Sequence, residues 1–437
     1  MAGLKKIEGY EEYVINICPN DTMGEIIELE GLFIQLPVES SEDATLFSSD
    51  DRSEQYWKRQ ALPEALKGIR SMDEWAEQPS NFRKTYRSYI EQEFKRRSEG
   101  VWLYIDGQKT YITGTHYFML QWVKIDGSFY GDYLAFQRKL FIHAEACKVD
   151  PRCVGQLFTK CRRSGYTNMA VATLLSEGTL VKDKVLGIMS KTGSDARDNV
   201  FMKKVVSMYR HFPFFFKPIQ DGSTNPRVEL AFREPAKKIT KNNKTAQVGE
   251  ALNTIINWKN TVNNAYDGER LYYLFLDEAG KWEKPADIRE AWRINRTCLI
   301  VGRKIVGTAL VGSTVNPMAK GGSQYKDLWN DSDPTQRNAN GRTRSMLYRI
   351  FIPAYEALEG FFDKFGNPIV EDPETVAETS DGELIDYGAR TYLNNERKAL
   401  KNDANELNEV TRQFPFSTQE AFRDSVESSL FNLGKIY

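Results

Sequence analysis

Six consecutive apolar or aromatic residues, 271–276, are followed at once by two carboxylates, Asp277 and Glu278. A run of this length without polar alternation is typical of a strand covered on both faces, as in the middle of a parallel sheet. A second such run lies at 305–314, and from about residue 130 short apolar segments alternate with helical segments. This alternation predicts an α/β fold with a mostly parallel central sheet flanked by helices.

The same patterns predict the remaining elements. In the sheet region we expect strands at 156–159 and 185–190, helices at 168–176 and 194–212, an extended hairpin over 227–239 and a long loop over 320–340. Before this region we expect a strand pair within 24–34, an acidic loop at 39–51, a basic helix over 81–97 and a β-hairpin over 102–112. After it we expect a short strand and a charged helix from about 390 to 410.

Composition limits the function classes. The 437 residues carry a formal net charge of −1, so no overall basic field points to nucleic acid, although a local groove can still be basic. Five scattered cysteines form no CxxC pair and only three histidines are present, which makes a zinc site improbable on residue counts. No run approaches the 18 or so apolar residues of a membrane span, and the N-terminus has no apolar signal core.

A candidate phosphate loop follows the strand predicted at 156–159. Ordinary phosphate loops read GxxxxGK[ST], and their backbone N–H groups and lysine bind the phosphates. Here the loop consists of Lys160, Cys161, Arg162, Arg163, Ser164, Gly165, Tyr166 and Thr167. Tyrosine replaces the usual lysine, but a lysine at the front of the loop can reach the same phosphates, and arginine suits phosphate oxygens. Taken alone, such a string is more often a basic surface turn before a helix.

The carboxylate pair lies about 110 residues downstream, at the end of a predicted buried strand. Ligands of open α/β sheets bind at the carboxyl ends of the strands. Asp277 would hold Mg²⁺, and Glu278 would act as general base towards an attacking water. A strand that ends in an acidic turn is the alternative. Together with the phosphate loop, the pair predicts an ATP site with ATP and Mg²⁺ as ligand and cofactor.

Further residues support this site in sequence order. The amide of Gln137, next to Phe136, can hydrogen-bond an adenine edge, although it also fits the polar face of a helix. Gly312, Ser313 and Thr314 follow an apolar strand and could sense the γ-phosphate, or they form an ordinary turn. Ser194 or Asp195 could cap the helix that begins there. Arg342, Arg344 and Arg349 could contact a DNA backbone, or they form a solvated basic face.

The ordered set resembles the large terminase subunit, the DNA-packaging motor of tailed bacteriophages and herpesviruses. Phe136-Gln137 resembles the adenine-binding motif, 160–167 the Walker A loop, 274–278 Walker B and 312–314 the coupling motif. Residues 412–422 resemble the segment that closes the motor domain. The resemblance covers about residues 130–432. It assigns the phosphate role to Lys160 and leaves open whether Arg162 or Arg163 is the loop arginine.

The resemblance implies a P-loop NTPase core of the RecA-like (ASCE) kind at 129–350, an N-terminal α+β extension at 1–128 and a linker or lid subdomain at 351–437. ATP would bind between the core and this subdomain. It also implies a pentamer on the portal protein that threads double-stranded DNA into a procapsid in the host cytoplasm, helped by a small terminase subunit and without a membrane. An isolated motor domain could be monomeric. An arginine stabilising the γ-phosphate would come from the same or a neighbouring chain, the candidates being Arg197, Arg233, Arg270 and Arg303.

Family members usually continue into a nuclease domain, and this sequence stops about where that domain would begin, so we expect no nuclease activity from it. Two alternatives remain. A helicase would carry a second motor core, for which no motifs are seen. A pseudo-ATPase or assembly scaffold would bind nucleotide or partner proteins without hydrolysis, and the tyrosine at position 166 is the best argument for it.

Overall fold

The computed structural model describes residues 3–18, 24–38, 49–221, 225–233 and 251–424. The loop expected at 39–51 and the hairpin expected at 227–239 lie partly outside these ranges. Of the second segment, the described residues form the strand β11, Glu229–Phe232, which pairs with β12, Thr254–Trp258.

The centre of the molecule is a seven-stranded sheet in the order β11-β12-β10-β13-β16-β9-β17. Its other strands are β9 (Gly155–Thr159), β10 (Val185–Met189), β13 (Tyr273–Asp277), β16 (Thr308–Ser313) and β17 (Leu347–Phe351). All neighbours run parallel except β11 at one edge. β16 separates the phosphate-loop strand β9 from the carboxylate strand β13. This order confirms the predicted P-loop NTPase fold. One strand, β16, lies between the two strands that lead into the sequence motifs.

Successive residues of the central strands point to two different cores. In β13, Tyr273 and Phe275 join one hydrophobic cluster, whereas Leu274 and Leu276 join a second cluster on the opposite face. Side chains alternate between faces along a strand, so an unbroken apolar run satisfies both cores at once. The prediction that 271–276 contains a strand covered on both faces is therefore confirmed.

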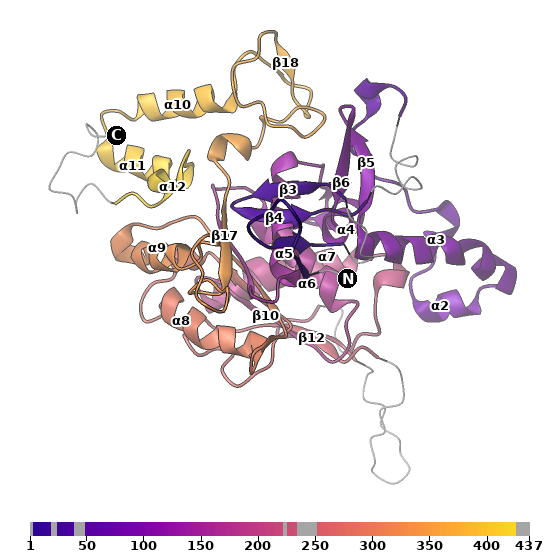
Figure 1. The fold of residues 1–437 in the computed structure, drawn as a ribbon. Coiled ribbons are helices and arrows are strands. Elements are labelled where there is room, and N and C mark those ends of the chain that lie inside the picture. Colours follow the sequence, from indigo (N-terminus) through magenta and orange to yellow (C-terminus); the bar gives the residue numbers. More distant parts are fainter. Residues whose placement is uncertain (1–2, 19–23, 39–48, 222–224, 234–250, 425–437) are drawn as a thin grey trace.

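Helices cover both faces of the sheet (Figure 1). One side carries α5 (Ala135–Val149), α6 (Tyr166–Gly178) and a π-helical segment, Asp195–Val206, that continues into α7 (Ser207–Arg210). The other side carries α8 (Ile288–Asn295) and α9 (Gly322–Asn330), with the two-residue strands β14 (Ile300–Val301) and β15 (Lys304–Ile305) before β16.

The prediction of a long loop over 320–340 is wrong in its first half, because Gly322–Asn330 is the helix α9. The polar and glycine content of this segment suggested a loop. However, Tyr325, Leu328 and Trp329 are spaced to form one buried face, and all three pack into the second cluster.

The chain before α5 adds a four-stranded sheet and a helical layer. The sheet, in the order β1-β2-β4-β3, is formed by β1 (Gly3–Lys5), β2 (Val14–Asn16), β3 (Ile26–Leu29) and β4 (Leu32–Gln35). The helical layer and its hairpins are α2 (Met72–Glu77), α3 (Ser80–Glu99), β5 (Val101–Ile105), β6 (Gln108–Ile112), α4 (Gly114–Trp122), β7 (Lys124–Ile125) and β8 (Phe129–Tyr130). The expected strand pair, basic helix and hairpin are all present.

These first residues share a core with the sheet region. Tyr117 and Phe118 of α4 belong to the same cluster as Phe158 of β9. The buried Arg97 of α3 donates to the backbone carbonyls of Leu175 and Ser176 at the end of α6. Its guanidinium also lies 4.2 Å from the Phe118 ring centroid, and burial lowers its pKa to about 9.

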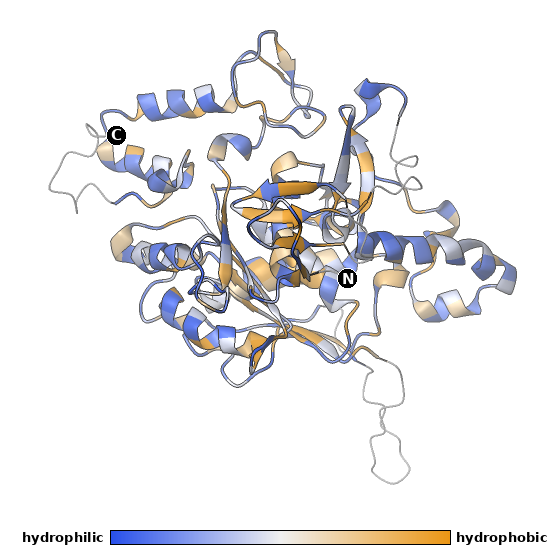
Figure 2. Cartoon of the chain, in the orientation of Figure 1, coloured by the Kyte–Doolittle hydropathy of each residue, from blue (hydrophilic) through white to orange (hydrophobic). Residues whose placement is uncertain are grey.

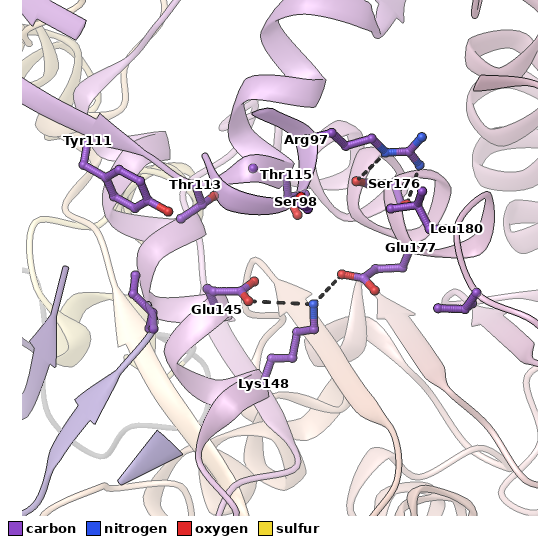
Figure 3. A pocket seen from close by; sticks show the side chains of 13 residues that line it. Arg97, Ser98, Tyr111, Thr113, Thr115, Glu145, Lys148, Ser176, Glu177 and Leu180 are labelled. Atoms are coloured by element: carbon purple, nitrogen blue, oxygen red, sulfur yellow. Dashed lines mark hydrogen bonds and ion pairs between the residues drawn. The ribbon is translucent and has the colours of Figure 1, made fainter. Parts of the chain in front are cut away.

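A polar cavity of about 270 Å³ lies at this junction (Figure 3). Lys148 of α5 points between two carboxylates there, Glu177 of α6 at 2.5 Å and Glu145 at 3.7 Å. The charged groups in this cavity are thus already engaged with one another, and they connect α5 to α6 beside the end of α3.

The chain after β17 forms the strand pair β18 (Ala377–Glu378) and β19 (Leu384–Ile385) and the helices α10 (Ala389–Ala399), α11 (Ala404–Gln413) and α12 (Thr418–Ala421). The prediction of one continuous charged helix over 390–410 is wrong, because the chain turns at 400–403 between α10 and α11. Asp403 accepts a hydrogen bond from the backbone N–H of Glu406 and starts a new helix. Phe422 anchors the end of this segment against Tyr325 and Trp329 of α9.

Hydropathy follows this architecture. The central strands are hydrophobic, whereas α3 and α10 are mainly hydrophilic (Figure 2). Within the described ranges, none of the helices combines the length and the apolar character needed to span a membrane.

Candidate nucleotide site

The parallel strands bring the two sequence motifs to one edge of the sheet. In the registers of β13, β16 and β9, Asp277 pairs with Gly312, and Ser313 pairs with Thr159. The carboxylates after β13, the residues after β16 and the loop after β9 therefore leave the sheet side by side. This is the edge at which open α/β sheets bind ligands.

Two residues of the loop between β9 and α6 have a left-handed backbone conformation. Arg163 has φ +64° and Gly165, immediately before α6, has φ +73°. A glycine adopts this conformation without steric cost, whereas a residue with a side chain, such as Arg163, adopts it uncommonly. The first N–H groups of α6 have no partner within the helix, so they and the helix dipole favour an anion at this point.

Tyr166 does not occupy the phosphate position. Its side chain is buried, and its hydroxyl donates to Gln156 Oε1 at 3.0 Å. The ring lies against β16 so closely that a Cβ atom on Gly312 would stand 2.2 Å from Tyr166 Cε1. Burial raises the pKa of the Tyr166 hydroxyl, which is held neutral. The residue that departs from the ordinary motif is a core residue beneath the loop.

Asp277 lies beside two hydroxyl groups. Thr167 Oγ1 donates to Asp277 Oδ1 at 3.1 Å, and Ser190, just after β10, donates to Oδ2 at 3.1 Å. Burial raises the pKa of Asp277 and the neighbouring Glu278 adds to this rise, while Lys160 and the two hydroxyls oppose it. The loop and the acidic strand, 110 residues apart, are thus in direct contact.

This donor set fits Mg²⁺. The described residues contain no cluster of three His, Cys, Asp or Glu side chains that could hold a metal ion without other ligands. Mg²⁺ needs no such cluster, because it usually keeps several waters and is bound through one or two carboxylates plus phosphate oxygens of a substrate. The Asp277 carboxylate and the Thr167 hydroxyl supply oxygen ligands of this kind.

Glu278 is held between two lysines. Its Oε1 lies 2.9 Å from Lys160 Nζ and its Oε2 lies 2.7 Å from Lys281 Nζ. Burial would raise the pKa of Glu278, but the two ammonium groups outweigh it and lower the pKa to about 2. Burial likewise disfavours the Lys160 ammonium, yet Glu278 and Asp277 outweigh it and raise the pKa of Lys160. The lysine at the front of the loop therefore carries its charge inside the site.

A cavity of about 690 Å³ opens beside the loop. Phe136, Gln137, Lys160 and the loop residues 163–167 line one side, and residues of the segment after β17, at 357–362 and 380–381, line another. Gln137 Nε2 lies 3.6 Å from where a Cβ atom on Gly165 would stand, and Phe136 stacks on Phe362 with ring centroids 5.9 Å apart. Ser164 also lines this cavity, and its buried hydroxyl has no hydrogen-bond partner among the described residues.

The structure distinguishes the remaining loop residues. Arg163 lines the cavity, but Arg162 and Cys161 do not. Arg162 instead faces α11, where its backbone N–H donates to Gln413 O at 2.9 Å and its guanidinium to Gln413 Oε1 at 2.8 Å. The Cys161 thiol is buried in the core, and burial raises its pKa to about 12.

The residues after β16 touch both motifs. Gly312 lies under Tyr166, and Ser313 O accepts a hydrogen bond from the Lys160 backbone N–H at 2.9 Å. Thr314 O lies so close to the turn after Glu278 that it would stand 2.8 Å from a Cβ atom on Gly280. The coupling segment predicted from the sequence thus bridges the loop and the acidic pair.

None of the four arginines suggested as γ-phosphate partners lines the cavity. Arg197 pairs with Asp198 and Arg233 with Asp221, while Arg270 and Arg303 are exposed. Of the arginines considered for DNA, Arg344 pairs with Asp331, Arg349 pairs with Asp333, and Arg342 donates to the backbone carbonyl of Arg303.

Sequence reasoning missed Ser190, Gln156 and Lys281. Ser190 could have been found, because it is the first polar residue after a strand parallel to β13. Lys281 follows Glu278 by three residues, a spacing that brings side chains together in one helical turn. Gln156 lies in the middle of an apolar strand, and only the fold shows that it meets Tyr166.

No protein-family model and no curated protein matches the chain. Among solved structures, it is similar to the large terminase of bacteriophage HK97, with 13% sequence identity and a TM-score of 0.41 over 69% of this chain and 54% of that one. It is also similar to the large terminase ATPase domain of Thermus phage P74-26, with 12% identity and a TM-score of 0.36 over 60% of this chain and 88% of that one. The chain thus spans about half the length of the HK97 protein.

Proposed function

We propose that this protein hydrolyses ATP in the cavity beside the 160–167 loop. The observation that carries the proposal is the direct contact between the two motifs, through Thr167 with Asp277 and through Lys160 with Glu278. These are one cation, one hydroxyl and two carboxylates at the carboxyl edge of a parallel sheet, in front of a helix N-terminus. That combination suits a triphosphate with a divalent cation.

In this proposal the nucleotide lies along the cavity wall. Gln137 and Phe136 receive the adenine, and the phosphates lie against the N-terminus of α6. Arg163 supplies a guanidinium and Lys160 a buried ammonium group, and Ser164 supplies a hydroxyl that has no hydrogen-bond partner in the described part of the chain. Cys161, Arg162 and Tyr166 contribute backbone only, because their side chains face away or lie in the core.

Thr167 and Asp277 would hold Mg²⁺, which would supply charge neutralisation at the phosphate oxygens. Glu278 is the carboxylate next to that pair, and in our proposal it accepts a proton from the attacking water. The water oxygen bonds to the γ-phosphorus, the bond between this phosphorus and the β,γ-bridging oxygen breaks, and ADP and inorganic phosphate leave. The proton then passes from Glu278 to solvent.

Lys160 must change partner for this chemistry. A carboxylate with a pKa near 2, engaged by two ammonium groups, is a poor proton acceptor. A bound triphosphate offers Lys160 a more highly charged partner than Glu278 does. Nucleotide binding would therefore release one side of Glu278 as it occupies the lysine.

We further propose that ATP hydrolysis drives the movement of double-stranded DNA, as in a phage large terminase. The support is the order of the motifs in the sequence together with the 312–314 bridge and the contact between Arg162 and Gln413. The contact between Arg162 and Gln413 links the phosphate loop to the 351–437 segment, which we propose acts as a lid. Partnership with a portal protein and a small terminase subunit, and assembly as a pentamer, belong to the same proposal.

The experiment is a phosphate-release assay on the full chain with Mg²⁺, with and without double-stranded DNA. We expect Glu278→Gln and Lys160→Met to lower the rate at least a hundredfold, as is typical when a catalytic group is removed. Lys182→Met is the matched control, because Lys182 is an exposed lysine before β10, at the opposite edge of the sheet. Equal release from all four proteins would refute hydrolysis at this site. ATP binding without release by the wild type would instead support a pseudo-ATPase.

A further inference from the structure

The two oxygens of Glu278 have different partners. Lys160, in the phosphate loop, holds Oε1 at 2.9 Å, and Lys281 holds Oε2 at 2.7 Å. The two lysines approach the carboxylate from different segments of the chain. A change at one of them therefore leaves the other contact available.

The two lysines also differ in their surroundings. Lys160 lines the nucleotide cavity and its side chain is 8% exposed, whereas Lys281 does not line the cavity and its side chain is 32% exposed. A triphosphate in the cavity would meet Lys160 and leave Lys281 in place.

The backbone around Lys281 is well fixed. Lys281 ends a 3-10 turn, Ala279–Lys281, and its N–H donates to Glu278 O at 2.9 Å. The next residue, Trp282, is buried, and its Nε1 donates to Asp277 O at 3.2 Å. This short turn places the Lys281 ammonium beside Glu278 independently of the phosphate loop.

Glu278 itself has an unusual backbone. Its φ of +50° is a left-handed conformation that a residue with a side chain rarely adopts. Strain of this kind persists where surrounding contacts hold it, and it aims the side chain in one direction. With neither oxygen held, the carboxylate would still rotate about its last torsion, which is broad.

We propose that Lys281 is a positioning residue for ATP hydrolysis: it keeps Oε2 of Glu278 anchored when the phosphates take Lys160, so that Oε1 faces the attacking water. The inference rests on the function proposed above. It assigns the proton-accepting role to one named oxygen, the one that Lys160 releases. In this proposal Lys281 contacts neither the nucleotide nor the attacking water, and it acts only through Glu278.

A second role for Lys281 must be separated from this one. Burial would raise the pKa of Glu409 on α11, but a hydrogen bond from Gln413 and the charge of Arg412 lower it, and the charge of Lys281 adds a smaller lowering effect. Loss of Lys281 could therefore also loosen α11. Glu409→Gln removes this charge interaction and leaves Glu278 untouched.

The test compares wild type, Lys281→Met, Lys281→Arg and Glu409→Gln in the full chain. Steady-state ATP hydrolysis gives kcat and KM, and titration with a fluorescent ATP analogue gives Kd. We expect Lys281→Met to lower kcat about tenfold or more while KM and Kd change less than twofold, since positioning acts on the transition state. Lys281→Arg should recover most of kcat, and Glu409→Gln should behave as wild type.

Several outcomes would overturn the inference. These are a wild-type kcat in Lys281→Met, a loss of nucleotide affinity as large as the loss of kcat, or the same loss of kcat in Glu409→Gln. Lys281→Gln is a second neutral variant in case the methionine variant folds poorly. An inactive wild type would refute the proposed function and this inference with it, whereas an active wild type with an unaffected Lys281→Met would refute this inference alone.

Discussion

At position 166 a tyrosine follows the glycine where an ordinary phosphate loop carries lysine. The ring is buried over Gly312 and the hydroxyl is bonded to Gln156, so the side chain stabilises the floor of the loop. Positive charge reaches the site from Lys160 at the front of the loop instead. The residue at position 166 therefore packs into the core, and Lys160 supplies the positive charge of the site.

The two arginines of the loop differ in what their side chains contact. Arg163 lines the cavity and Arg162 is bonded to Gln413. We expect Arg163→Ala to weaken ATP binding about tenfold, the loss expected for a charge-assisted hydrogen bond. Arg162→Ala should change the affinity less than twofold. Titration of both variants with a fluorescent ATP analogue checks this, and a larger loss in Arg162→Ala would contradict our assignment.

At the scale of elements, β16 and α6 are in contact at Gly312, and this contact joins the 312–314 segment to the loop before α6. An added Cβ atom there would stand 2.2 Å from the Tyr166 ring, so something must shift. We expect Gly312→Ala to lower the free energy of unfolding by about 1–3 kcal/mol, the usual cost of overpacking a core. Urea denaturation measures the effect.

Gly68→Ala is the control for Gly312→Ala. A Cβ atom on Gly68 would meet nothing within 4 Å, and the residue is exposed with no left-handed backbone. Its free energy of unfolding should stay within about 0.5 kcal/mol of wild type. Equal stability of the two variants would mean that β16 and the loop are not in tight contact.

Over the whole molecule, the first 128 residues and the sheet region share one core, and a buried histidine lies where they meet. His116 of α4 is fully buried and stacks on Phe141 of α5, with ring centroids 4.7 Å apart. Burial, with a smaller contribution from Arg138, lowers its pKa to about 3. The native protein keeps this imidazole neutral at pH values where an exposed histidine is charged.

This burial makes stability depend on pH. Below pH 6.5 the unfolded chain binds a proton at His116, whereas the native chain does so only near pH 3. Stability is therefore lost as the pH falls through this window, by about 1.4 kcal/mol per pH unit from this residue. We expect His116→Phe to reduce the difference in unfolding free energy between pH 7.5 and 5.0 by about 2 kcal/mol, as measured by urea denaturation. An unchanged difference would show that His116 is not held neutral.

The sequence by itself determined the elements and the chemical candidates. An unbroken apolar run can only be satisfied between two cores, and the polar residues that end such strands mark the ligand edge. Lys160, Thr167, Asp277, Glu278 and the 312–314 segment were therefore identifiable from local pattern. The same local reasoning failed at α9, where a few buried aromatic residues outweigh a loop-like composition, and at the break between α10 and α11.

Only the tertiary structure decided which side chains meet. The strand order places β16 between the two motif strands, sends the Tyr166 ring into the core, turns Arg163 to the cavity and Arg162 to α11, and brings Lys281 to the second oxygen of Glu278. Pairing between distant strands depends on packing summed over the whole chain, which no local window of sequence contains. The residue types were thus readable from the sequence, but their partners were set by the fold.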